Sequence, residues 1–284
     1  MATKIPFRKI YVDSRYCTSD SVSSSNFKVE LPITAQMPDN TVFFVNDVCI
    51  AHAWKTVEPD IHDKLCLYVT KLQDGVRIRQ SYIITLAAGN YTPTTFAAEL
   101  ATRLTAAVAD TFYVQLGSDN DVTIGISNTI ANNAADTRFR ILTDSEISQD
   151  AYFANRNSTG TCNDIINNED KFSSGSGDYK TYSSGFLSLN WINNIYISSP
   201  NLGSFDTIFA GRGDNNIVKK VPVLVNYGYQ IVDQLMSTNE FLDCSKQTLQ
   251  TLEFHLKTGK GIYVPLHGAH VSFSLVFNKF NADL

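Results

Sequence analysis

Apolar and polar side chains alternate along much of the chain, which is the pattern of a half-buried β-strand. Residues 271–277 place Phe273 on an apolar face, and residues 77–86 do the same with Ile84. Similar short apolar runs occupy residues 41–50, 65–72, 112–116, 122–126, 192–197, 217–225 and 249–256. Because most of these runs are bounded by Gly, Pro, Asn or Asp, the pattern predicts an antiparallel sandwich or barrel.

One segment departs from this period of two. Its apolar residues recur every four positions, at Phe96, Leu100, Leu104 and Val108. This spacing predicts an amphipathic helix, with Thr92 as its N-cap and Pro93 as its first residue. Since strands surround the helix in the sequence, we expect it to lie across a sheet with its apolar side in the core.

The composition suggests an arm and one domain. Residues 1–25 are expected to form an extended N-terminal arm, and residues 26–284 a single domain with insertions at about 88–111 and 144–185. The second insertion is rich in Asn, Ser and Gly, and residues 144–178 hold seven acidic side chains against two basic ones. We therefore expect a long polar loop at the surface.

The overall charge limits the function classes. The chain has 284 residues, of which 18% are charged, with 23 basic against 28 acidic side chains. This balance argues against a nucleic-acid-coating protein. The five cysteines are scattered, as expected for free thiols in a reducing compartment, and no apolar run reaches the length of a signal peptide or a membrane span.

The sequence contains no familiar catalytic constellation, so we expect no enzyme, no cofactor and no metal. It lacks a nucleophile elbow, a zinc-protease helix motif, a phosphate loop and a dinucleotide fingerprint. His267 and His270 could offer two imidazoles to a metal, and His52 and His62 flank a stretch with acidic residues. Neither pair has the spacing of a known ligand set, which favours turn or core histidines.

Two short segments could contact other molecules. The N-terminal arm carries Lys4, Arg8, Lys9 and Arg15 ahead of a serine-rich tether, and could dock on a neighbouring protein or remain a solvated terminus. Arg212, Gly213 and Asp214 form a tripeptide that could display a guanidinium and a carboxylate to a receptor. The simpler interpretation is that its glycine shapes a turn.

Several segments in order along the chain carry a family resemblance. They are residues 10–15, Asn26-Phe27, 89–92, 199–203, 217–223 and 266–275. Together these segments resemble the minor capsid proteins, or pentons, of Polinton-like viruses, adintoviruses and virophages. The tripeptide at 212–214 does not contribute to this resemblance.

The resemblance implies an all-β protein, in which residues 26–284 form an antiparallel jelly-roll sandwich. The amphipathic helix and the long polar loop predicted above are then insertions that depart from a minimal jelly roll. It implies a homopentamer at the five-fold vertices of an icosahedral capsid, with the major capsid protein as second partner. The protein would then be made in the host cytoplasm and reside in the virion. The alternative is a β-sandwich recognition module that binds carbohydrate or a cell-surface receptor.

Overall fold

The computed structural model describes residues 5–6, 8–108, 112–126, 137–156, 158, 160–168, 180–202, 216–234 and 241–280. Contacts group the chain into two compact units. The first unit combines residues 1–54 with 192–284, and the second consists of residues 55–191. The second unit is thus a continuous piece of chain inserted into the first.

The first unit is a jelly roll. Its strands are β1 (Lys9–Asp13), β2 (Asn26–Gln36), β3 (Thr41–Ala51), β10 (Asn194–Ser198), β11 (Ile217–Pro222), β12 (Gln230–Gln234), β13 (Leu242–Asp243), β14 (Thr248–Lys257) and β15 (Val271–Lys279). Leaving out the two-residue β13, the first strand pairs with the last, the second with the second-last, the third with β12, and β10 with β11, all antiparallel. This nested pairing is that of a ribbon of eight strands rolled into two sheets.

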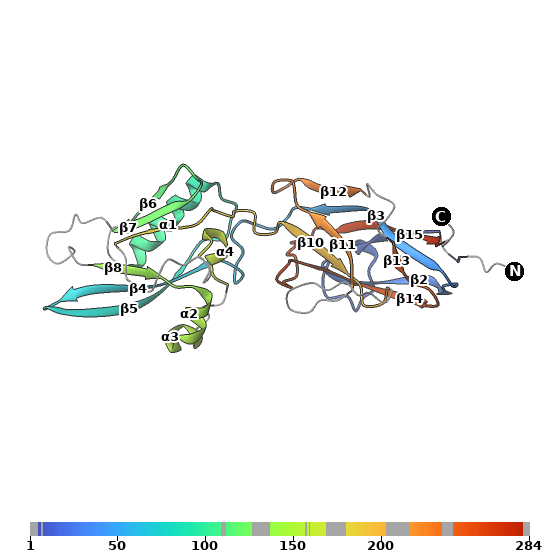
Figure 1. Ribbon diagram of the computed structural model, residues 1–284, viewed down its shortest axis with the longest axis horizontal. Coiled ribbons are helices and arrows are strands. Elements are labelled where there is room, and N and C mark those ends of the chain that lie inside the picture. Colours follow the sequence, from blue (N-terminus) through green and yellow to red (C-terminus); the bar gives the residue numbers. More distant parts are fainter. Residues whose placement is uncertain are drawn as a thin grey trace. The chain divides into compact units, whose positions relative to one another are not determined.

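The two sheets have the orders β1-β15-β3-β12, with β13 also on β3, and β11-β10-β14-β2 (Figure 1). Aromatic side chains fill the space between them. Phe254 of one sheet meets Phe273 of the other edge to face, with 4.9 Å between ring centroids, and also packs against Phe27 at 5.7 Å. Phe43 and Phe277 form a second pair at 5.9 Å. These rings are buried, so hydrophobic burial holds the sandwich together.

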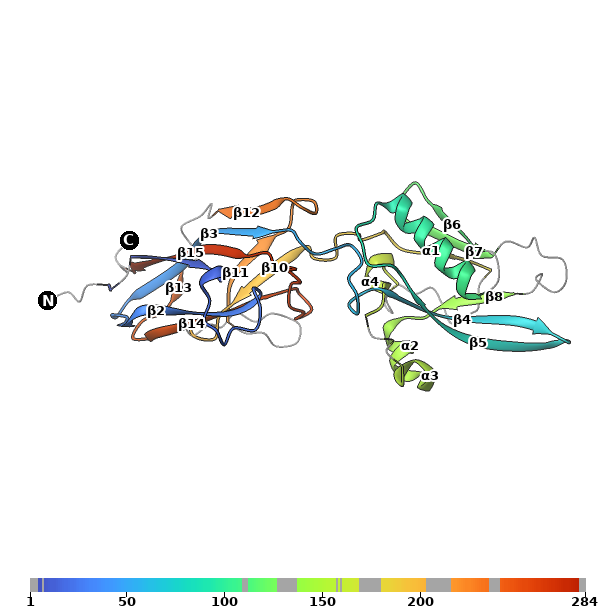
Figure 2. The same ribbon diagram turned by 180° about the vertical axis from the view of Figure 1, so that it is seen from behind.

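The second unit has sheets of its own. Its strands are β4 (Lys64–Gln73), β5 (Val76–Thr85), β6 (Phe112–Leu116), β7 (Val122–Ile126), β8 (Arg138–Ile141) and β9 (Thr181–Ser183), and its helices are α1 (Pro93–Val108), α2 (Asp144–Gln149), α3 (Ala151–Ala154) and α4 (Asn163–Ile166). The strands form two sheets of three, ordered β5-β4-β8 and β6-β7-β9. In both views α1 runs beside β6 and β7 (Figure 2).

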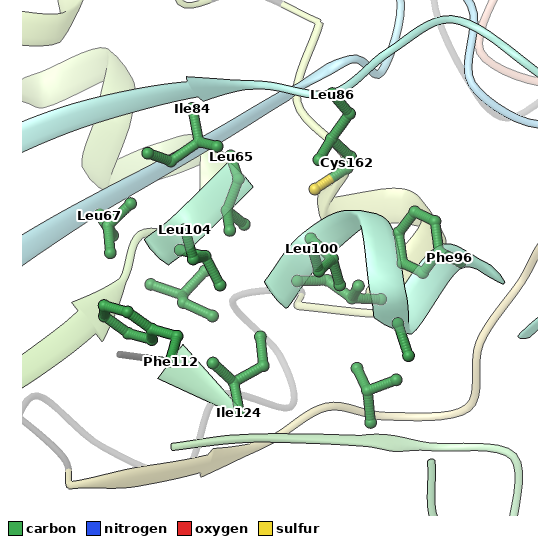
Figure 3. Packing of buried hydrophobic residues seen from close by; sticks show 14 of the residues in the cluster. Leu65, Leu67, Ile84, Leu86, Phe96, Leu100, Leu104, Phe112, Ile124 and Cys162 are labelled. Carbon is green, nitrogen blue, oxygen red and sulfur yellow. The ribbon is translucent and has the colours of Figure 1, made fainter. Parts of the chain in front are cut away.

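The helix predicted from the four-residue spacing is confirmed. The Thr92 hydroxyl accepts the N–H of Thr95 at 3.2 Å, the contact of an N-cap, and Pro93 is the first helical residue. Phe96, Leu100 and Leu104 are buried with Leu65, Leu67 and Ile84 of the β4–β5 sheet and Ile124 of β7 (Figure 3). The apolar side of α1 is therefore the centre of the second unit's core.

The expected boundaries differ from this arrangement in two ways. The segments 88–111 and 144–185 do not form separate insertions into one domain, because strands β4 to β9 join them in one unit with its own core. Ile84 is buried, as its place on an apolar face predicts, but together with Leu86 it packs in that core and not between the jelly-roll sheets. Period-two alternation identifies a buried face without identifying what covers it.

The segment 144–185 is not simply a polar loop. It contains α2, α3, α4 and β9, and buries Phe153, Ile165 and Ile166; the serine- and glycine-rich run at 173–177 lies outside the described residues. Its polar residues include helix caps. Thr143 and Glu146 form a capping box at α2, and the Asp150 carboxylate accepts two backbone N–H groups at α3. Composition alone does not distinguish a cap from a loop residue.

We predict that Phe273→Ala destabilises the first unit by about 3–5 kcal/mol, since the substitution removes buried apolar surface and leaves a cavity beside Phe254. Phe280→Ala is the matched control, because that ring is half exposed at the end of the same segment. Denaturant unfolding of both variants measures the difference. Equal midpoints for the two would contradict the core assignment.

We also predict that Gly160→Ala destabilises the second unit more than Gly75→Ala does. Both glycines have positive φ, +82° and +77°, so each substitution carries the same conformational cost of about 1–2 kcal/mol. Only at Gly160 would the new Cβ also lie 2.3 Å from a backbone oxygen, that of Asp60, whereas Gly75 has open space. Equal unfolding free energies would show that the Asp60 loop moves aside without cost.

Candidate interaction surfaces

The basic N-terminal segment is largely built into the jelly roll. Lys9 begins β1, whose five residues pair with β15, and the Lys9 ammonium lies 3.6 Å from the Asp47 carboxylate of β3. Arg15 belongs to a short 3-10 helix, Ser14–Tyr16, and Arg8 accepts the Phe277 N–H through its carbonyl. The expected extended arm of residues 1–25 is therefore wrong for residues 9–16. Lys4 lies outside the described residues.

The serine-rich stretch after β1 is also held in place. The Ser21 hydroxyl accepts the Lys28 N–H at 2.9 Å, and the Thr18 N–H donates to the Lys28 carbonyl at 2.8 Å. Lys28 in turn pairs with Asp20 at 2.9 Å. Serine and threonine side chains form such local hydrogen bonds readily, which explains why a composition typical of a tether is ordered here.

Asp13 links the first strand to the turn that follows it. Its carboxylate accepts the Arg15 N–H at 2.9 Å and the Arg15 Nε–H at 3.0 and 3.1 Å. These hydrogen bonds from Arg15 hold the pKa of Asp13 below its usual range. Burial by itself would raise the pKa of Asp47. Hydrogen bonds from Ser274 and Asn46, together with the nearby Lys9 ammonium, outweigh the effect of burial, so the pKa of Asp47 lies below its usual value.

A serine, a histidine and an aspartate meet beside this strand without forming a catalytic triad. The buried Ser14 hydroxyl accepts the Val271 N–H at 3.1 Å and lies 3.4 Å from Nδ1 of His270. The Asp13 carboxylate accepts its hydrogen bonds from Arg15. The arrangement ties the first strand to the start of the last, and His267 occupies a turn with φ of 47°.

The sheet that contains β1 at one edge has β12 at the other, and an exposed apolar surface near β12 is not predicted by the alternation of apolar and polar residues. Residues 221–232, from the end of β11 into β12, form a run of twelve without a charged side chain. Within it Leu224 is 86% exposed, Tyr229 67% and Val232 61%, and Tyr227 is about half exposed. We call these four residues the loop surface. The missing charges are visible in the sequence, but the exposure of the apolar side chains is not.

His52 holds the loop surface in shape. Its N–H donates to the Tyr229 carbonyl and its carbonyl accepts the Gly228 N–H, both at 2.9 Å. Its Nδ1 lies 2.9 Å from the Val225 carbonyl, so that nitrogen carries a proton. Burial lowers the pKa of His52, and the ring stacks on the buried Trp54 with 4.1 Å between centroids. His52 is thus a core histidine that positions an exposed loop.

The other sites considered from the sequence are only partly covered by the described residues. Arg212, Gly213 and Asp214 lie outside the described residues. Within the residues that the structure describes, no three His, Cys, Asp or Glu side chains group as metal ligands, and no helix is long and apolar enough to span a membrane. All five cysteines are free, and burial raises the pKa of Cys66 and Cys244 to about 12.

The pairing of eight strands defines a jelly roll, a fold shared by viral capsid proteins, lectin domains and cupins. No protein-family model matches the sequence, and no curated protein matches it. Among solved structures, the crystal structure of the selenomethionine-labelled mavirus penton protein is similar, with a TM-score of 0.51 and 10% sequence identity. The similarity covers 96% of this chain and 100% of that one. The chain therefore has a penton-like fold, and the resemblance noted from its sequence is confirmed at the level of the fold.

We predict that acid weakens the attachment of the first strand. The folded pKa values of Asp13 and Asp47 lie below the ordinary value of an aspartate, about 3.9, so their carboxylates stabilise the fold above that pH. This stabilisation is lost as the pH falls through the lower, folded values. Unfolding of the wild type and of Asp13→Asn/Asp47→Asn should differ at pH 6 and converge below about pH 3. A difference independent of pH would contradict this linkage.

Proposed function

We propose that the protein is a structural component of a viral capsid, a penton subunit without enzymatic activity. The observation that carries the proposal is the extent of the fold match. Because 96% of this chain aligns with all of the mavirus penton protein, the match extends over both compact units and not over a jelly roll alone. A match limited to the jelly roll would also fit a lectin-like module.

In this proposal five copies form a ring at each five-fold vertex of an icosahedral capsid, and the ring contacts the major capsid protein. The protein resides in the virion after synthesis in the host cytoplasm. A ring of identical subunits requires two different complementary surfaces on each copy, because its contacts run head to tail. The jelly roll offers opposite edges of one sheet for that purpose.

We propose a docking arm that is shorter than the residues 1–25 expected from the sequence. Lys9 and Arg15 make ion pairs within the jelly roll, so the part of the arm that could reach the major capsid protein ends at Arg8. Lys4 and Arg8 are its basic side chains. A receptor-binding role of Arg212, Gly213 and Asp214 stays a prediction from the sequence.

We expect the purified protein to be a ring of five subunits in a native mass spectrum and to show five-fold symmetry in averaged micrographs. Permanent interfaces of this kind bury more than about 2,000 Å² each and withstand dilution. A monomer that binds glycans on an array would instead support the recognition module. A monomer without glycan affinity would contradict both functions.

Removal of residues 1–7 together with Arg8→Ala should leave the ring intact and reduce incorporation into capsids during co-assembly with the major capsid protein. This variant deletes Lys4 and the Arg8 side chain but keeps β1 and the Arg8 carbonyl that Phe277 binds. Deletion of residues 1–24 is the control for strand loss, since it removes β1 from the sheet and should unfold or dissociate the protein. Unchanged incorporation of the first variant would exclude docking by the arm.

A further inference from the structure

The chain exposes two aromatic surfaces at opposite edges of one sheet. The order β1-β15-β3-β12 places β1 at one edge and β12 at the other, and among the described strands each pairs with a single neighbour. Val232 of the loop surface lies in β12, and Leu224, Tyr227 and Tyr229 belong to the segment that leads from β11 into it. At the β1 edge, Tyr11 and Tyr16 are 78% and 79% exposed. We call Tyr11 and Tyr16, with Lys9 and Arg15, the strand surface.

The loop surface has the properties of an interface core. Aromatic side chains are enriched and charged ones depleted at the centre of protein interfaces. Residues 221–232 hold no charged side chain, and Leu224, Tyr229 and Val232 within them are more than half exposed. An exposed sheet edge is normally protected by lysine or proline, and β12 contains neither. Its one acidic residue, Asp233, instead makes an ion pair with Lys219 of β11 at 3.2 Å.

The loop surface is also preorganised. Three hydrogen bonds to His52 fix the loop, and Tyr227 contacts the His52 ring edge to face at 6.2 Å. A loop already held in one shape loses little conformational entropy when a partner covers it. Anchoring to a buried histidine that stacks on a buried tryptophan therefore favours a binding surface over a solvated turn.

The strand surface complements the loop surface chemically. Each of its exposed rings has a cation nearby, with Lys9 Nζ 4.8 Å from the Tyr11 centroid and the Arg15 guanidinium 5.9 Å from that of Tyr16. The loop surface adds two exposed tyrosine rings and no cation of its own. Cations attract aromatic faces, and uncharged aromatic groups pack against one another without like-charge repulsion.

The geometry points to a head-to-tail contact in which the strand surface of one copy docks on the loop surface of the next. The partner is a second copy of this chain, because the chain itself carries both complementary surfaces. Opposite edges of one sheet face away from each other, so each copy can use both at once, which produces a ring instead of a closed pair. This inference rests on the proposed homopentamer and names the surfaces that build it.

Two variants test the contact, each with one surface altered at exposed positions. The loop variant is Leu224→Glu/Tyr229→Glu, and the strand variant is Tyr11→Glu/Tyr16→Glu. Each should raise the protein concentration needed for half-assembly by about 100-fold or more, since buried tyrosine anchors dominate such interfaces. The control variant, Val76→Glu/Phe186→Glu, changes two side chains of the second unit that are each 63% exposed, and should assemble like the wild type. Circular dichroism and thermal melting test whether all three variants are folded.

Mixing the two variants makes the test specific for a head-to-tail contact. Each variant alone is monomeric, but together they retain one matching pair of surfaces, so the mixture should form a dimer of one loop variant and one strand variant and nothing larger. Native mass spectrometry resolves these species. Two monomers in the mixture would show that the surfaces do not meet each other.

The outcomes separate this inference from the proposed function. If the wild type forms rings and the loop variant also forms them, the loop surface is not the contact, and the penton proposal stands. If the wild type is monomeric at every concentration, the homopentamer is wrong, and the head-to-tail contact is wrong with it.

Discussion

The structure depends on the pairing of the first strand with the last. β1 and β15 lie at the two ends of the chain, and the Ser14 hydroxyl that accepts the Val271 N–H is separated from it by 257 positions. Contacts so distant in sequence carry a high cost in chain entropy, and the nested pairs inside them reduce that cost stepwise. Once β1 is paired, the basic N-terminal segment becomes part of a sheet edge, and this pairing presents Tyr11 and Tyr16 at the surface proposed for assembly.

The inserted unit leaves this pairing intact because its two ends are held together. The Trp191 indole donates to the Lys55 carbonyl at 3.0 Å, and the rings of His62 and Trp191 pack in a T-shaped pair with 4.3 Å between centroids. Residues 55–191 therefore connect β3 to β10 as a short link would. The unit also buries its own apolar surface around α1, so it requires none from the jelly-roll sheets.

The proposed assembly gives one reason for the distribution of charge on the first unit. Lys9 and Asp47, Arg15 and Asp13, and Lys219 and Asp233 form ion pairs within the unit. These pairs neutralise charged side chains near both edges of the sheet, where exposed tyrosines also lie. For a monomer such surfaces favour non-specific association. For a subunit of a permanent ring they supply the apolar area that the contact buries.

The sequence by itself determined the strand-rich class, the helix at Pro93–Val108 with its cap, and the buried faces of the alternating runs, because these follow from local periodicity and capping chemistry. It did not reveal that Ile84 packs in a different core from Phe273, or that Asp150 caps a helix within an acidic stretch. It also placed Lys9 and Arg15 in an arm, although Lys9 pairs with β15 and Arg15 belongs to the short 3-10 helix that follows β1. Only the tertiary structure decided these points, because local pattern shows which face of a segment is apolar, whereas its partner is chosen among segments hundreds of residues away.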